Sequence, residues 1–342
     1  MIPVVRVSGG AEERGRAVGE ALAEPIGRSL DFYRGYLQRR GISRESLPLI
    51  LRPHRRAAEG ALPDLVAEID AMAEGAGADP WDLFAVNAFE ELEPAMSEPS
   101  MERCTSFTAS TPGGPILAHN EQWLAGDLGN VAVVVADPTD GPGFASPTVV
   151  ACLPAVGINN AGLAQAIMSL SAGDDREGVP RVLVSRHALQ ARFSDDAVKR
   201  ADLPGRAGGY AHMLAGGGGA AFTIETTAER LAVLDGHGPH TNHYLHQDLT
   251  LIGDRPRPGS VSRLERAREL LEDRPPRSPE DAMAVLADHD GHPQPICLHP
   301  DPEDGDDAEA VVFSMVCSLR DRRMWVAPGP PCSTPFEEIE VA

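Results

Sequence analysis

The sequence has very little lysine, few aromatic residues and no long apolar run. Lys199 is the only lysine among 342 residues, so Schiff-base chemistry has a single candidate. Aromatic residues make up 5% of the chain. No stretch approaches the roughly 18 consecutive apolar residues of a membrane-spanning helix, and the first residues lack the pattern of a secretory signal. We therefore expect a cytoplasmic protein with no membrane partner.

The chain is also short of positive charge. Lysine and arginine together number 30 against 51 aspartates and glutamates, which leaves a formal net charge of -21. A field of this sign repels phosphate backbones and anionic lipid headgroups, so nucleic acids and membrane surfaces are poor partners. With 42% hydrophobic residues, a chain of this length can bury a large core, and disorder is excluded.

The five cysteines lie far apart, are odd in number and include no C-x-x-C pair. They are Cys104, Cys152, Cys297, Cys317 and Cys332. This pattern fits reduced thiols better than a disulfide framework or a thiolate zinc site. We therefore expect no metal and no cofactor, and a chemical role for one or two of the thiols at most.

The spacing of apolar residues along the chain changes near residue 100. Residues 11–94 place apolar side chains at steps of three and four, which predicts several helices. Residues 94–103 are polar, contain two prolines and show no periodicity, which is typical of an exposed loop. From Cys104 onward, short strand-like runs alternate with turns, and further helices are predicted at 180–199 and from Ser262. This order of elements predicts an α+β fold with antiparallel sheets.

Cys104 is the strongest candidate for a nucleophile, because it begins a predicted strand directly after this loop. The alternative is an ordinary half-buried cysteine of a sheet. Self-processing chemistry needs a thiol that attacks the carbonyl of the preceding residue, here Arg103, and a thioester that water then hydrolyses. Cleavage leaves Cys104 with an α-amine, whose ordinary pKa of roughly 7.7–8.0 allows it to act as base for its own thiol.

Two amide side chains follow on the strand that the turn TPGGP would return alongside Cys104. These are Asn120 and Gln122, in the segment NEQW. Antiparallel pairing of the two strands could place either side chain close to the thiol. An ordinary polar strand end is an equally good interpretation of this spacing.

The segment HTNHY, residues 240–244, contains a third amide, Asn242. An uncharged amide donor can stabilise an oxyanion without changing the proton count, which suits acyl transfer. The alternative is a metal site made by histidines spaced three residues apart. Gly238 and Pro239 argue against a continuous helix there, and no carboxylate or thiolate pattern completes a zinc site, so the metal is the weaker hypothesis. The histidines concerned are His237, His240, His243 and His246.

Several of these motifs, in this order, resemble those of a known family. They are CTSFTAS, LAHNEQW, GINNAGL, HTNHYL and the closing stretch SLRDRRMWVAPGPPC. They are similar to the isopenicillin N acyltransferase (acyl-CoA:6-aminopenicillanic acid acyltransferase) family of N-terminal nucleophile cysteine hydrolases. The resemblance implies a four-layer αββα sandwich formed by residues 104–342 and a helical N-terminal segment, 1–103. It also implies that the precursor cleaves itself between Arg103 and Cys104 and that the two fragments stay associated.

The resemblance further implies amide hydrolysis or acyl transfer through a thioester on Cys104. Asn242 matches the oxyanion-stabilising asparagine of the family, and Asn120 matches the asparagine of its N-x-D motif. Gln122 stands at the aspartate of that motif, where it supplies hydrogen bonds but no charge unless Glu121 turns inward. The expected substrate is the amide of a small molecule or modified peptide. Hydrolysis is slightly favoured, because water needs no second binding site, and an acyl-CoA is the alternative acyl donor.

A second hypothesis is a family member that is never cleaved and only binds a small molecule near Cys104. Two residues favour this interpretation: Arg103, at a position where glycine is common in the family, and Gln122, at the position of the family's aspartate. A metalloenzyme that uses the histidine cluster is the third. One intact species in denaturing mass spectrometry would support the binding protein, whereas two fragments would support the enzyme.

Overall fold

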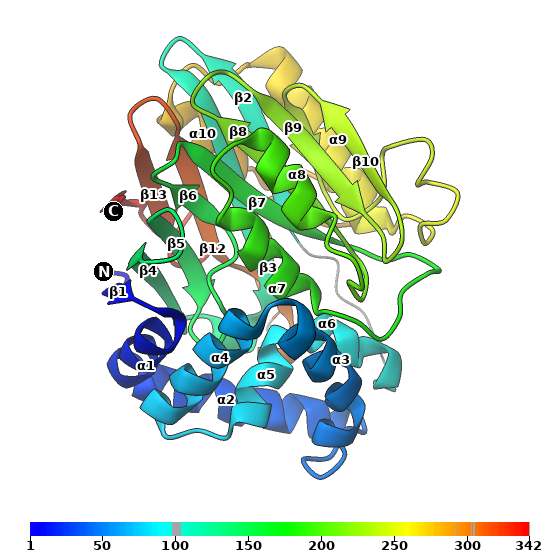
Figure 1. Ribbon diagram of the computed structural model, residues 1–342. Coiled ribbons are helices and arrows are strands. Elements are labelled where there is room, and N and C mark those ends of the chain that lie inside the picture. The colour runs from blue at the N-terminus through cyan, green and yellow to red at the C-terminus, as the bar shows by residue number, and fades with distance from the viewer. Residues whose placement is uncertain (98–103, 292, 302, 304, 342) are drawn as a thin grey trace.

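Two β-sheets form the centre of the molecule (Figure 1). In the computed structural model, residues 1–97, 104–291, 293–301, 303 and 305–341 are described, and their strands form one sheet of eight and one of six. The larger sheet has the order β1(Val4–Gly9), β4(Val131–Pro138), β5(Phe144–Val149), β6(Gly157–Asn159), β7(Leu163–Leu170), β8(Gly209–Gly216), β9(Ala221–Thr226), β10(Leu231–Asp235). The smaller sheet has the order β11(Gly238–His240), β2(Thr105–Thr111), β3(Gly114–Leu124), β12(Glu309–Ser318), β13(Arg323–Ala327), β14(Glu337–Glu340).

The two sheets pack face to face through apolar side chains. Strands β1 and β4 run parallel, and the other neighbouring strands of the described chain run antiparallel. Leu117 and Met315 of the smaller sheet meet Ala166 and Met213 of the larger sheet in one buried cluster. Alternation along each strand turns every second side chain into this cluster, which is how the sequence encodes the interior between the sheets.

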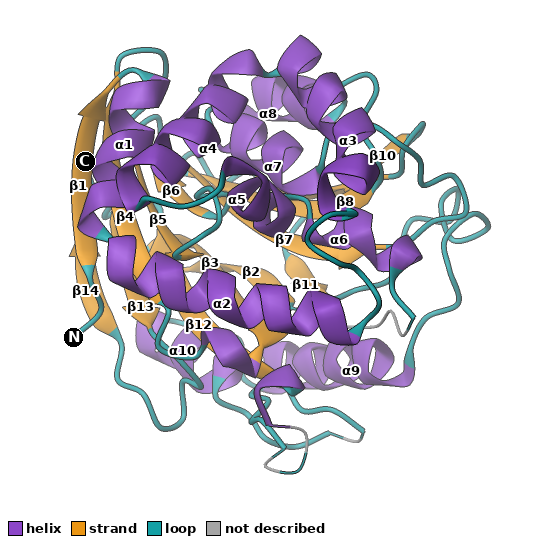
Figure 2. Ribbon diagram, turned by 90° about the horizontal axis from the view of Figure 1, so that it is seen from below, coloured by secondary structure: helices purple, strands orange, loops and turns teal. Residues whose placement is uncertain are grey.

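Helices cover the outer face of each sheet (Figure 2). Helices α7(Arg181–Leu189) and α8(Ser194–Ala201) lie on the larger sheet, and α9(Pro258–Asp273) and α10(Pro279–Leu286) lie on the smaller one. Val285 and Leu286 of α10 pack against Phe107 and Val316. The layer order is therefore αββα, which confirms the α+β, four-layer prediction. The predicted helix at 180–199 is two helices, α7 and α8.

The N-terminal segment forms a helical layer at one end of the sandwich (Figure 1) and also contributes a strand to it. Its helices are α1(Ala11–Ala21), α2(Ala23–Arg39), α3(Leu47–Ala61), α4(Pro63–Ala76), α5(Pro80–Asn87) and α6(Phe89–Leu92). Helices α1 and α4 approach closely at Gly15, where a Cβ atom would lie 2.1 Å from the carbonyl oxygen of Glu68. Strand β1, which the sequence did not predict, forms an edge of the larger sheet. Residues before Cys104 are thus part of the sheet architecture.

Three short 3-10 helices complete the described elements. They are η1(Glu93–Ala95), η2(Ala125–Asp127) and η3(Gly305–Asp307). None of the helices in the described ranges has the length and apolar character needed to cross a bilayer. The chain ends lie at one edge of the molecule (Figure 1), where the main-chain N–H of Ile2 donates to Glu337 Oε1 at 2.9 Å.

Candidate active site

Cys104 lies directly before β2 and packs in the core between the sheets. Its thiol donates a hydrogen bond to Glu121 Oε1, with 3.1 Å between Sγ and the oxygen. Burial and the negative charge of Glu121 raise the pKa of the thiol well above its usual range, and the main-chain N–H of Gln122 and the charge of Arg263 offset only part of this. In the uncleaved chain the thiol is therefore protonated, and a base must remove its proton before the sulfur can attack.

The backbone at Cys104 adopts the left-handed conformation, with φ of 63°. A side chain with a Cβ atom disfavours this region, at a cost of about 1–2 kcal/mol. Among the described residues, the only other non-glycine residue with positive φ is Arg322, in the turn between β12 and β13. The strain therefore lies at the N–Cα bond of Cys104, next to the peptide bond that is predicted to break. Arg103, the other residue of that bond, lies outside the described residues.

The register of β2 and β3 decides which side chains reach the thiol. Thr105 pairs with Asn120 and Ser106 pairs with His119, so the next position along β3 from Asn120, Glu121, lies across from Cys104. The four side chains on this face form one hydrogen-bonded chain. His119 Nε2 lies 3.0 Å from Glu121 Oε2, and His119 Nδ1 lies 2.8 Å from Ser106 Oγ. The carboxylate of Glu121 is thereby held between a buried imidazole and the thiol.

Asn120 and Gln122 point to the opposite face of β3. Asn120 Nδ2 donates to the carbonyl oxygens of Leu286 and Ile296 at 2.9 and 3.0 Å, and its Oδ1 accepts from Ser314 Oγ at 2.6 Å. Gln122 Nε2 lies 3.4 Å from the carbonyl oxygen of Ile296. The expectation that one of these two side chains lies at the thiol is therefore corrected. The side chain of Glu121 occupies that place, because side chains alternate along a strand.

Asn242 is linked to the nucleophile through a buried arginine of α9. Arg263 Nη2 donates to Asn242 Oδ1 at 3.1 Å, and Arg263 Nη1 donates to the carbonyl oxygen of Cys104 and, at 3.0 Å, to Thr105 Oγ1. A guanidinium only donates, so the amide oxygen of Asn242 must face Arg263. The amide nitrogen then points away and donates to the carbonyl oxygen of Ser169 at 3.2 Å. The orientation of the Asn242 amide is thus fixed at both ends, by Arg263 and by the main chain of β7.

The histidines near Asn242 do not form a metal site. His240 uses both ring nitrogens in hydrogen bonds of 2.7 Å, one to Glu225 Oε1 and one to the carbonyl oxygen of Thr241. His243 Nδ1 lies 2.8 Å from Ser260 Oγ, and burial lowers the pKa of this imidazole to about 4. Within the described ranges, none of the groups of His, Cys, Asp and Glu that lie close enough to share an ion includes a histidine of this segment. This geometry contradicts the histidine-cluster metalloenzyme.

An apolar cavity of about 70 Å³ lies beside Glu121, and a charged cleft of about 430 Å³ lies next to it. Glu90 lines both, so the cleft and the cavity meet at this residue. The cavity walls come from α5, α6 and both sheets. They include Val86, Phe89, Trp123, Cys152, Ile167, Tyr210 and Phe313. The charged side chains of the cleft include Glu91, Asp175, Arg181, Asp254 and Arg257.

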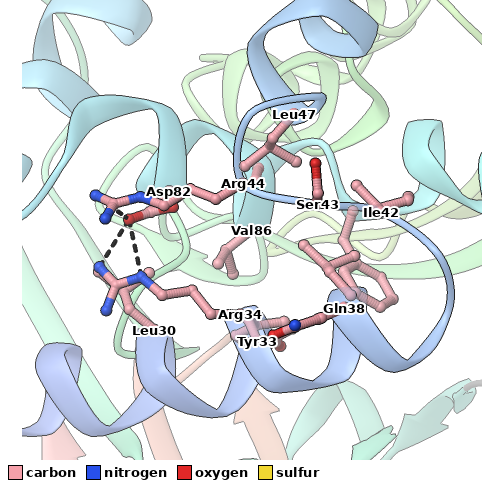
Figure 3. A pocket seen from close by; sticks show the side chains of 13 residues that line it. Leu30, Tyr33, Arg34, Gln38, Ile42, Ser43, Arg44, Leu47, Asp82 and Val86 are labelled. Atoms are coloured by element: carbon pink, nitrogen blue, oxygen red, sulfur yellow. Dashed lines mark hydrogen bonds and ion pairs between the residues drawn. The ribbon is translucent and has the colours of Figure 1, made fainter.

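A separate cavity of about 210 Å³ lies within the N-terminal helices, between α2, α3 and α5 (Figure 3). Asp82 forms ion pairs there with Arg34 at 2.7 Å and with Arg44 at 3.7 Å. Val86 and Phe89 line both this cavity and the apolar cavity beside Glu121. The two spaces are thus divided by apolar side chains of the N-terminal segment, and only the one beside Glu121 contacts the thiol's partner.

Comparison with known proteins identifies the family. A family model described as acyl-coenzyme A:6-aminopenicillanic acid acyl-transferase matches residues 109–332. The chain belongs to this family. The description of this family names the transfer of an acyl group, so the chain belongs to a family of acyl-transfer enzymes.

Two solved structures are also similar to this acyl-transferase family member. A mutant of the conjugated bile acid hydrolase from Clostridium perfringens has 10% identity and a TM-score of 0.47, with 69% of this chain and 92% of that chain covered. Penicillin V acylase from Agrobacterium tumefaciens has 15% identity and a TM-score of 0.46, with 69% and 86% covered.

Two residues of this candidate site were missed from the sequence, His119 and Arg263, and the position of Glu121 was left open. Counting residues back from the turn at Pro112 and Gly113 pairs Cys104 with Glu121, so the hairpin itself carried that signal. His119 lies two positions before Glu121, so the alternation of side chains along β3 places it on the same face. No local pattern points to Arg263, which lies 159 residues from Cys104 and reaches it only because α9 packs under β2.

Proposed function

We propose that this acyl-transferase family member is a self-processing N-terminal cysteine amidohydrolase, activated by hydrolysis of the bond between Arg103 and Cys104. The observation that carries the proposal is the position of Cys104: its thiol donates to Glu121 at 3.1 Å, and its carbonyl oxygen is joined to Asn242 through Arg263. These contacts support Cys104 as the nucleophile, Glu121 as the acceptor of its proton and Asn242 as the oxyanion donor.

Self-cleavage would proceed by an N-to-S acyl shift. Glu121 Oε1 accepts the thiol proton, Sγ forms a bond to the carbonyl carbon of Arg103, and the bond from that carbon to the nitrogen of Cys104 breaks. The nitrogen gains a proton and becomes a free amine. Water then adds to the thioester, which releases the carboxyl group of Arg103 and regenerates the thiol. Breaking this bond relieves the left-handed strain at Cys104, where φ is 63°.

Turnover would follow the same order with an external amide. The α-amine of Cys104 takes the thiol proton, since its ordinary pKa of roughly 7.7–8.0 leaves part of it unprotonated near neutrality. Sγ attacks the substrate carbonyl, and the oxyanion is stabilised by the amide N–H of Asn242. The amine product leaves with a proton, and water hydrolyses the thioester on Cys104.

The two spaces beside the site support a substrate with an apolar acyl group and a polar amine. The apolar cavity of about 70 Å³ suits a short hydrophobic acyl chain, whereas the charged cleft of about 430 Å³ suits a polar small molecule or modified peptide. Discharge of the thioester by water is favoured over transfer to an acceptor amine, because water needs no second binding site. An acyl-CoA as acyl donor is the competing arrangement.

The fragments 1–103 and 104–342 are proposed to remain together after cleavage. Strand β1 of the first fragment pairs with β4 of the second over six residue positions. Val86 and Phe89 of the first fragment also form a wall of the apolar cavity. Separation would expose this core and open the site, so association is favoured by the hydrophobic effect.

N-terminal sequencing and denaturing mass spectrometry of the purified protein test the proposal. We expect two fragments, one of which begins at Cys104, that elute together under native conditions and hydrolyse apolar acyl amides. A single chain of 36.3 kDa that turns over amides at full rate would contradict the self-processing mechanism.

The second candidate is an uncleaved member that binds a small molecule without catalysis. It is favoured by the low exposure of Cys104, 3%, and by the raised pKa of its thiol, since both describe an unreactive sulfur. It predicts one intact chain without amidase activity under all conditions.

A further inference from the structure

Four side chains of the metal-ligating type converge at a site outside the one described above. His289, Cys297, His299 and Cys332 each offer a ring nitrogen or sulfur, and these four atoms all lie within 4.8 Å of one another. His299 Nε2 lies 3.1 Å from His289 Nε2, 3.1 Å from Cys332 Sγ and 3.8 Å from Cys297 Sγ. Three of the residues belong to the loop that follows α10, and Cys332 follows β13.

One hydrogen bond accounts for only one of the three contacts that His299 Nε2 makes. A ring nitrogen of a neutral histidine carries either one proton or one lone pair, so His299 Nε2 can complete one good hydrogen bond. Three polar atoms nevertheless face it. A cation at the centre of the four atoms would accept a lone pair from each of them at once.

We propose that these four residues bind one Zn²⁺ ion as a structural site. Two thiolates and two imidazoles are the donor set of closed tetrahedral zinc sites. With zinc bonds of about 2.3 Å to sulfur and 2.0–2.1 Å to nitrogen, a tetrahedron has edges of about 3.3 Å between nitrogens and 3.6 Å between nitrogen and sulfur. The separations of 3.1, 3.1 and 3.8 Å are close to these values. Four protein ligands leave no open position for a substrate, so the ion has no catalytic role.

The position of the ion explains what it would stabilise. It joins the loop after α10 to the turn after β13, across the 33 residues that separate His299 from Cys332. Ile296, next to the ligand Cys297, accepts a hydrogen bond from Asn120 at 3.0 Å. The ion would therefore hold the loop against the outer face of β3, behind the nucleophile. The sequence did not predict this site, because its two cysteines form no C-x-x-C pair.

Metal analysis of the full-length protein, purified without an affinity tag, tests the proposal. Inductively coupled plasma mass spectrometry should find about one zinc per chain. Cys297→Ser and Cys332→Ser should each lose it, and Cys332 is exposed, so that variant should still fold. Cys317→Ala is the matched control, because Cys317 is buried in β12 and is not one of the four ligands; it should keep the metal.

Cobalt provides a readout independent of activity. After the native metal is removed with a chelator, Co²⁺ should produce the visible absorption of tetrahedral, thiolate-bound cobalt in the parent protein and not in Cys332→Ser. The proposal is overturned if neither Zn²⁺ nor Co²⁺ binds. It is equally overturned if Cys297 and Cys332 are found as a disulfide, with a mass lower by two hydrogen atoms and no metal.

Discussion

The two faces of strand β3 carry equally polar residues with different partners. On the inner face, His119 and Glu121 form a hydrogen-bonded chain that ends at the thiol of Cys104. On the outer face, Asn120 and Gln122 donate to main-chain carbonyls at the end of α10 and in the loop after it. In the segment NEQ, the middle residue therefore contacts the thiol, and the residues on either side of it hold the loop in place. Changes on the inner face should alter rate, and changes on the outer face should alter stability.

The largest effect is expected from Cys104→Ala, which removes the nucleophile served by the inner face. Cleavage should be abolished, and amide turnover should fall by at least about 10⁴-fold, because no other group forms the thioester. Denaturing mass spectrometry and an amidase assay measure the two losses. Cys317→Ala changes a buried cysteine of β12 that pairs with Leu117, four positions along β3 from Glu121, and should keep both. Retained turnover in the Cys104 variant would remove the basis for the mechanism.

Glu121→Gln should have the next largest effect, since it keeps the shape of the side chain and removes the proton acceptor. Cleavage should slow by about 10²–10⁴-fold, the usual contribution of a general base. The charge of Glu121 raises the pKa of the Cys104 thiol, so its loss should lower that pKa. In uncleaved protein, alkylation of the thiol should therefore begin at lower pH in the variant than in the parent. Cleavage at the parent rate would show that another group takes the proton.

Asn120→Ala, on the outer face, should reduce stability and leave the chemistry nearly intact. It leaves the buried carbonyls of Leu286 and Ile296 and the hydroxyl of Ser314 without their partner, at a cost of about 2–4 kcal/mol. Urea unfolding in a Cys104→Ala background, where the chain stays in one piece, measures the change in the free energy of unfolding. A collapse of turnover without loss of stability would instead favour a catalytic role for Asn120.

Gln122→Leu should have the smallest effect. The hydrogen bonds of this side chain are long, at 3.4 Å, and its Oε1 atom is buried without a partner. Replacement by an apolar side chain of similar size should change the free energy of unfolding by less than about 1 kcal/mol. Turnover should stay within about threefold of the parent, since the side chain does not reach the thiol. A loss as large as that of Glu121→Gln would return Gln122 to the site as the counterpart of the family's aspartate.

Local patterns predicted much of the sandwich. The runs at Thr105–Thr111 and Gly114–Leu124 became a hairpin because the turn between them contains the glycines that a tight reversal requires. Helix α9 followed from the periodicity of SRLERARELLE. Strand β1 escaped prediction, since its six residues are stabilised by pairing with β4, more than 100 positions away. Pairing over such a separation leaves no periodic signal in the strand itself.

Some residues of the candidate site could also be predicted from local sequence features, and others could not. Cys104 was found because a cysteine at the start of a strand after a polar loop is a local feature, and Asn242 because its segment matches a family motif. The choice between Glu121 and Gln122 depended on parity across a hairpin, which a count of the turn residues could have settled. Arg263 could not be found, because its contacts with Cys104 and Asn242 exist only once α9 lies under β2.

The sequence by itself determined the kinds of element, the α+β class and the nucleophile candidate, because these depend on neighbours a few positions apart. Tertiary structure alone decided which carboxylate meets the thiol, which arginine orients Asn242, and which cysteines and histidines lie together after α10. These pairings depend on how layers pack over long chain separations. Packing is set by the sum of many weak apolar contacts, and no short segment of the chain contains that sum.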